Sequence, residues 1–176
     1  MARAALAVLL ILVVPHGSSA EPLPRIRILD PVLKSLFEHG TTQSPTLRAL
    51  VEKVEAASIL VFVEGGIRMP DQIGARLNFV TSINGVRYVR VAVDCTLPPR
   101  RQVALLAHEL QHVLEIADRS DIQDVEAMES LYEDIGFQTS EHGRHKSFET
   151  DAAIATQDAV DEELGGRTRL PAHAAY

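Results

Sequence analysis

Two histidines and a glutamate in the sequence HELQH, at positions 108–112, are the residues of this chain best suited to chemistry. On an α-helix, residues four apart lie one turn apart on the same face, so His108 and His112 can point at one metal ion. Zn²⁺ is the expected ion, because it binds neutral imidazole nitrogens at about 2.0–2.1 Å. Glu109 lies about 100° round the helix, where it can take a proton from a metal-activated water. The pattern therefore predicts hydrolytic attack of water on a carbonyl group.

The residues that flank this motif predict a buried helix. Between Val103 and Ala117 there is no Gly or Pro, and Ala, Leu and Gln are good helix formers. Pro98 and Pro99 predict where the helix starts, and it is expected to run to about Asp118. A polar stripe on an otherwise apolar helix favours a metal site over a helix with two surface histidines.

A catalytic zinc site usually has three protein ligands and one open position, so a third ligand is expected. The extended motif with a third His six residues after His112 is absent, because that position is Asp118. Glu115 shares the face of the two histidines, but it lies about 10.5 Å from His108 along the helix axis. We therefore interpret Glu115 as a neighbour of the ligands or a salt-bridge partner.

Two glutamates farther along the chain are candidates for the third ligand. Glu149 is predicted to begin a helix rich in Ala, where its charge needs a partner that a metal can supply. It could instead complement the helix N-terminus. Glu126 belongs to an acidic stripe on the preceding helix that is more typical of a solvated face. With Glu149 as ligand, Asp151 is expected to hydrogen-bond a ligand His and fix its tautomer.

The sequence HELQH at 108–112, followed by ETDA at 149–152, resembles the gluzincin group of zinc metallopeptidases. The resemblance implies zinc ligands at His108, His112 and Glu149, and a catalytic base at Glu109. It also implies a sheet whose edge strand lies beside the substrate cleft. A hairpin at Asn84-Gly85, directly before the active helix, would fit that arrangement.

The remaining pattern predicts an α+β fold of the zincin-like kind. A small antiparallel sheet with a hairpin is expected to pack against several helices, and the active-site helix follows the sheet. Asp30-Pro31 and Ser44-Pro45 each predict a helix start, and Gly40 is expected to end the first of these helices. The other expected elements are an extended segment over 21–27, strands over 58–63, 76–83 and 86–93, a helix from a Ser120/Gln123 capping box to Gly136, a polar loop over 141–146 and a helix over 148–164.

Residues 1–20 are expected to be a secretory signal peptide. Arg3 supplies the positive end, residues 4–14 form an apolar stretch that is short for a membrane span, and residues 18–20 are small. An uncleaved anchor is the alternative. Residues 21–176 are then expected to form a single zincin-like metallohydrolase domain, secreted or periplasmic.

Composition limits the classes of partner. The net charge is −7 and no basic patch stands out, so neither nucleic acid nor, after signal cleavage, a membrane is an expected partner. Cys95 is the only cysteine, which excludes an internal disulfide; it is expected to be a buried apolar filler, with a free thiol as the alternative.

The sequence thus predicts an exported zinc-dependent hydrolase, a peptidase acting on peptide or protein substrates. The alternatives are an exported metal-binding protein without hydrolytic activity and a binding module in which the motif is accidental.

Overall fold

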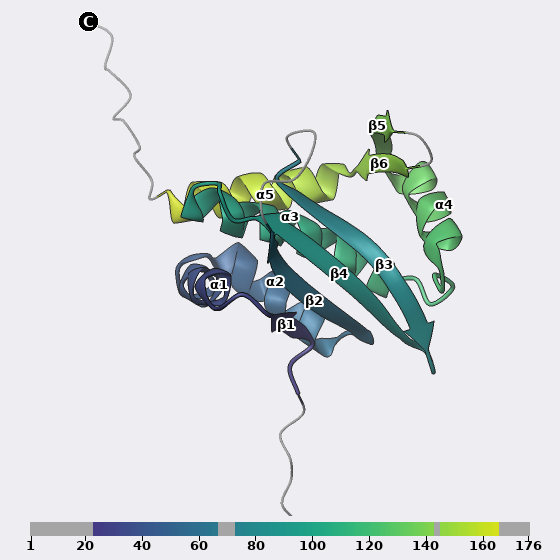
Figure 1. Ribbon diagram of the computed structural model, residues 1–176, viewed down its shortest axis with the longest axis horizontal. Coiled ribbons are helices and arrows are strands. Elements are labelled where there is room, and N and C mark those ends of the chain that lie inside the picture. Colours follow the sequence, from purple (N-terminus) through teal and green to yellow (C-terminus); the bar gives the residue numbers. More distant parts are fainter. Residues whose placement is uncertain (1–22, 67–72, 143–144, 166–176) are drawn as a thin grey trace, which may run out of the picture.

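A computed structural model of the chain describes residues 23–66, 73–142 and 145–165. Helices cover one face of a four-stranded sheet, and a separate two-stranded sheet lies beside them (Figure 1). The predicted signal peptide lies outside the described residues. The described elements, in chain order, are β1 (Ile26–Ile28), α1 (Pro31–Gln43), α2 (Pro45–Ala56), β2 (Ile59–Gly66), β3 (Ala75–Ile83), β4 (Val86–Asp94), α3 (Pro99–Ala117), α4 (Val125–Ile135), β5 (Phe137–His142), β6 (His145–Glu149) and α5 (Asp151–Leu164).

The main sheet is mixed, so the prediction of an antiparallel sheet is wrong, although the α+β class is correct. Its strand order is β1-β2-β4-β3, with β1 and β4 both parallel to β2 and with β3 antiparallel to β4. The helices α1 and α2 connect β1 to β2, and such a crossover allows the two strands to run in the same direction. The hairpin then places β4 inside the sheet and leaves β3 at its edge.

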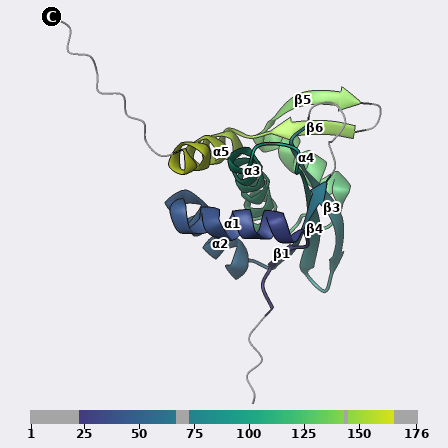
Figure 2. The same cartoon turned by 60° about the vertical axis from the view of Figure 1, so that its left-hand side comes forward.

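The core lies between the sheet and the helices, and α3 runs through its middle (Figure 2). Alternate residues of β4 point into this core, where Val89, Val91 and Val93 are fully buried. Leu106 and Leu110 of α3 are fully buried as well. Because α3 packs on the sheet, on α2 and on α5, nearly all of its faces are covered. The helix that carries the predicted metal motif is therefore the most enclosed element of the molecule.

The predicted starts of the first two helices are confirmed. Asp30 and Ser44 are the N-caps of α1 and α2, and each accepts a hydrogen bond from a backbone N–H three residues on. Gly40 does not end α1, which continues to Gln43. A Cβ atom at Gly40 would lie only 2.8 Å from Cγ1 of Val103, so this glycine allows α1 to approach α3 closely.

The hairpin between β3 and β4 turns at Asn84-Gly85 as predicted. Both residues have positive φ, 52° and 77°, as a type I′ turn requires. A shift of register lies in β3 between Phe79 and Thr81. Arg87 of β4 points into the molecule and is 4% exposed. Its guanidinium donates to backbone carbonyls at the end of α3, where a helix leaves such carbonyls without partners.

Three expected boundaries after α3 are wrong. The helix α4 begins at Val125 with Asp124 as its N-cap, because the Gln123 side chain donates to the Ser120 carbonyl and forms no capping box. Gly136 does end α4 as expected. Residues 141–142 and 145–146, which were predicted to belong to a polar loop, instead belong to the paired strands β5 and β6. The last helix begins at Asp151 rather than at 148, because Thr150 caps it.

Cys95 is exposed, so its expected role as a buried filler is wrong. It follows β4 in a turn beside Asp30, and partial burial together with this carboxylate raises the pKa of its thiol. None of the helices in the described residues is long and apolar enough to cross a membrane.

Candidate metal centre

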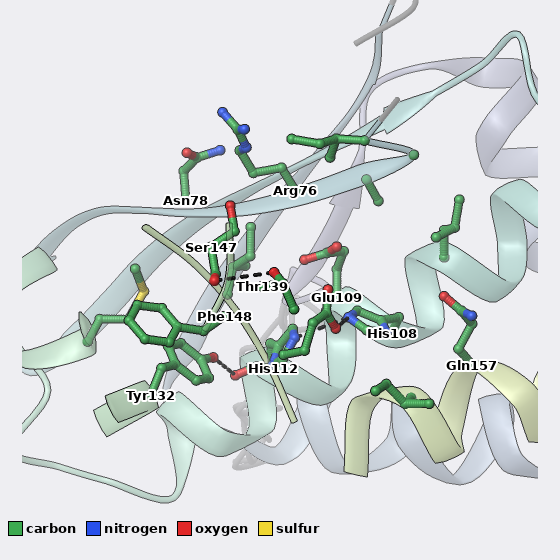
Figure 3. A pocket seen from close by; sticks show the side chains of 18 of the residues that line it. Arg76, Asn78, His108, Glu109, His112, Tyr132, Thr139, Ser147, Phe148 and Gln157 are labelled. Atoms are coloured by element: carbon green, nitrogen blue, oxygen red, sulfur yellow. Dashed lines mark hydrogen bonds and ion pairs between the residues drawn. The ribbon is translucent and has the colours of Figure 1, made fainter. Parts of the chain in front are cut away.

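The helix α3 presents three polar side chains from a largely apolar surface. His108, Glu109 and His112 are each only 5–6% exposed. They face a cavity between α3, β3 and the β5–β6 hairpin (Figure 3). Burying ionisable groups is costly unless they have partners, so the surroundings of these three residues decide what they can do.

The two histidines and Glu149 meet at one point. The Nε2 atoms of His108 and His112 lie 3.2 Å apart, and Oε2 of Glu149 lies 2.8 Å from Nε2 of His108. One ligand atom from each residue lies within 4.8 Å of the other two. The histidines come from one helix, whereas Glu149 is the last residue of β6. The structure therefore brings together the three residues that the sequence nominated as metal ligands.

The donor set fits a zinc ion. Two imidazole nitrogens and one carboxylate oxygen are ligands that Zn²⁺ prefers, and three such ligands leave a position open. Oε2 of Glu149 is buried and close to His108, but this contact lacks the geometry of a hydrogen bond. One proton between the two facing Nε2 atoms satisfies both nitrogens, but it leaves Oε2 of Glu149 beside them without a donor. A cation among these atoms would satisfy them all.

The pKa values of His108 and Glu149 shift in the directions expected of an ion pair. Burial lowers the pKa of His108, but the Glu149 carboxylate and the nearby charges of Glu109 and Glu115 outweigh burial and raise it. Burial raises the pKa of Glu149, but the contact with His108 outweighs burial and lowers it. Both shifts favour a positive charge beside the Glu149 carboxylate, which a metal would also provide.

Glu109 is the most deeply buried carboxyl group of the site. Burial is the largest influence and raises its pKa, while His112 and His108 act in the opposite direction. A carboxylate with a raised pKa holds a proton more tightly than a surface glutamate, which suits a general base. Its side chain lines the cavity next to both histidines (Figure 3).

His112 is held in place by two further residues. Its Nδ1 lies 2.7 Å from Oε2 of Glu115, one helical turn on. The hydroxyl of Tyr132 donates to the backbone carbonyl of His112 over 3.2 Å, and the two rings meet edge to face. Burial raises the pKa of Tyr132 well above its ordinary value, so the hydroxyl keeps its proton. The helical spacing indicates Glu115, whereas no pattern in the sequence singles out Tyr132 as a neighbour of His112.

Asp151 and Glu126 lie away from the histidines. Asp151 is exposed in the first turn of α5, and no hydrogen bond to either histidine is found in the described part of the chain. The carboxylate at Nδ1 of His112 is that of Glu115. Glu126 is exposed in the first turn of α4, where it complements the helix dipole. Among the described residues, only His108, His112 and Glu149 lie close enough together to hold a metal ion as a group of three.

The cavity above the histidines has a volume of about 610 Å³. The edge strand β3 forms one wall and the hairpin strands β5 and β6 form another. The side chains of Arg76 and Asn78 point away from the histidines, so the wall consists of the strand itself and its inward residues (Figure 3). The lining includes the apolar side chains of Val125, Met128 and Phe148, and Tyr132, which also lines the cavity, packs against the ring of His112. The lining residues Thr139 and Ser147 of the hairpin were not predicted, because a pair of strands with mostly polar residues has the composition of a loop.

Comparisons of the chain with known protein families, with curated proteins and with solved structures find no match.

Proposed function

We propose that this protein is a zinc-dependent hydrolase that cleaves peptide bonds. The observation that carries the proposal is the convergence of His108, His112 and Glu149 at a cavity that Glu109 also lines. Ligands contributed by two separate elements are hard to explain as a chance feature of one helix. The gluzincin resemblance of the motif leads to the same assignment.

Each residue has a defined part in the proposed reaction. His108, His112 and Glu149 would hold the zinc, which would supply Lewis-acid chemistry to a water and to the substrate carbonyl. Glu109 would accept the proton of the attacking water, and its buried position would keep bulk solvent from competing for that proton. The same carboxyl group can then pass the proton to the leaving amine.

A peptide substrate is favoured by the edge strand. In the described part of the main sheet, β3 pairs with β4 on one side only. The other side offers backbone N–H and C=O groups, which an extended peptide can pair with as an added strand. Residues Ala75 to Phe79 of β3 line the cavity, so a peptide held there would pass over the histidines.

The proposal includes export, based on the features of residues 1–20. Expressed in an exporting host, the protein should appear outside the cytoplasm with Glu21 as its first residue. Mass spectrometry of the secreted fraction measures this directly. Full-length protein retained in the cytoplasm would contradict export and leave the proposed chemistry unaffected.

The chemistry is tested by measuring zinc content and peptide hydrolysis on the same preparations. Wild-type protein should retain one Zn²⁺ per chain and cleave a mixed peptide library, and a chelator should stop cleavage. Glu109→Gln should keep the zinc and lose turnover by roughly 10²–10⁴-fold, because only the base is removed. Glu126→Gln, a matched change at an exposed glutamate, should behave as wild type. Zinc binding without cleavage would favour a metal-binding protein that is not a hydrolase, and no zinc would contradict the proposal.

A further inference from the structure

The carboxylate of Glu115 links two parts of the site that are far apart in the sequence. Its Oε2 atom lies 2.7 Å from Nδ1 of His112, and its Oε1 atom accepts a 2.7 Å hydrogen bond from the hydroxyl of Thr150. The side chain of Glu115 is 11% exposed. One carboxylate thus joins the end of α3 to the start of α5.

The first of these contacts fixes how His112 presents its ring. An ionised carboxylate can only accept hydrogen bonds, so Nδ1 of His112 must carry the proton. Nε2 is then the nitrogen with a free electron pair, and it faces His108 and Glu149. His108 has no such support in the described residues, because its Nδ1 is buried without a hydrogen-bond partner.

The second contact fixes the backbone beside Glu149. Thr150 is 3% exposed, and its hydroxyl donates to Glu115 while it accepts from the backbone N–H of Ala153. It is therefore both the N-cap of α5 and the point at which the β6–α5 junction is tied to α3. Because Glu149 immediately precedes Thr150, holding Thr150 also limits where the Glu149 carboxylate can lie.

We propose that Glu115 is a positioning residue that sets two metal ligands at once, His112 directly and Glu149 through Thr150. The inference rests on the proposed zinc function, and it assigns to Glu115 the role that was predicted from the sequence for Asp151. It predicts that the two halves of the ligand set are energetically coupled through one carboxylate.

Zinc affinity tests this role without reference to catalysis. The dissociation constant of Zn²⁺ is measured by competition with a chromogenic chelator at fixed pH. Glu115→Ala should weaken binding by roughly 10- to 100-fold, as loss of a group that orients a ligand does. Glu115→Gln keeps an oxygen that can accept from Nδ1 of His112, and it should restore most of the affinity.

Variants of Thr150 test the coupling. Thr150→Val removes the hydroxyl at nearly constant shape and should also weaken zinc binding, whereas Thr150→Ser keeps the hydroxyl and should not. Asp30→Ala is the control, because it removes the N-cap of α1, a helix that contributes no residue to the cavity. The double variant Glu115→Ala/Thr150→Val should bind zinc no more weakly than Glu115→Ala, because both changes break the same link.

The outcomes separate this inference from the proposed function. If wild-type protein binds zinc and Glu115→Ala binds it equally well, Glu115 does not position the ligands, and the metal function stands. If the losses from Glu115→Ala and Thr150→Val multiply in the double variant, Thr150 acts separately and the link is wrong. If Glu115→Ala does not fold, the comparison of Glu115→Gln with Thr150→Val and Thr150→Ser decides the same point. If wild-type protein binds no zinc, both proposals fail.

Discussion

Three glutamates at this site have chemically identical side chains, but they differ in role because their surroundings differ. Glu109 is buried, and burial raises its pKa. Glu149 touches His108, and this contact lowers its pKa despite burial. Glu115 accepts from a ring nitrogen and from a hydroxyl. The site therefore combines a carboxyl group suited to taking a proton, one suited to a cation and one that orients its neighbours.

The choice of third ligand is testable at single residues. Glu149→Ala should weaken zinc binding by more than the roughly 10- to 100-fold expected for loss of an orienting group, because it removes a ligand. Glu126→Ala should leave affinity unchanged, since Glu126 is exposed and lies apart from the histidines. Asp151→Ala should also be silent, contrary to the sequence-based expectation. Isothermal titration with Zn²⁺ measures all three, and a greater loss from Glu126→Ala than from Glu149→Ala would overturn the assignment.

The pH dependence of zinc affinity follows from the raised pKa of His108. Below that pKa the ring is protonated and its nitrogen has no free electron pair to offer the metal. Because the folded-state pKa lies above the ordinary 6.5, proton competition should begin above pH 6.5 as the pH falls. In the metal-free protein, the raised pKa of His108 also stabilises the folded state. This contribution is complete at pH values below the ordinary pKa of the group, and it is lost as the pH rises through the raised pKa. Zinc titrations between about pH 5.5 and 8 measure the competition. A zinc affinity that does not change over that range would contradict it.

At the scale of elements, the close packing of the β5–β6 hairpin against α4 determines where Glu149 lies. A Cβ atom at Gly136 would lie 2.5 Å from the backbone oxygen of Glu149, too close for either backbone to stay in place. Gly136→Ala should therefore shift the end of β6 and weaken zinc binding. Gly85→Ala is the matched control: its positive φ makes Ala costly by about 1–2 kcal/mol, but no atom lies within 4 Å of the new methyl group. Gly85→Ala should lower thermal stability and leave zinc affinity unchanged.

Local patterns predicted the elements whose signals are contained in a few residues. The caps at Asp30 and Ser44, the turn at Asn84-Gly85 and the helix around HELQH all depend on short-range spacing, and all are present. The mixed sheet was not predictable in this way, because the pairing of β2 with β4 depends on where the chain returns after β3. Glu149 lies beside His108, close to where the sequence placed it, although the helix predicted to contain it begins only at Asp151.

At the scale of the whole molecule, the three proposed ligands connect two parts of the fold that make few other contacts with each other. The helix α3 lies in the main core, whereas β5 and β6 form their own sheet and contact chiefly α4. The Glu149–His108 and Thr150–Glu115 contacts join the end of the hairpin to α3. A zinc ion held by ligands from both parts would therefore act as a cross-link between the hairpin and the core.

Zinc should accordingly raise the thermal stability of the protein. A ligand that binds only the folded state stabilises it by about 2.7 kcal/mol at a hundred times its dissociation constant, and each kcal/mol shifts Tm by about 2–4 °C for a chain of this size. Differential scanning calorimetry should therefore show Tm rising by several degrees with Zn²⁺ and falling with a chelator. Glu149→Ala should show a much smaller rise at the same zinc concentration, because the hairpin no longer supplies a ligand. Equal increases in wild type and Glu149→Ala would mean that zinc does not bridge the hairpin and α3, even if the histidines bind it.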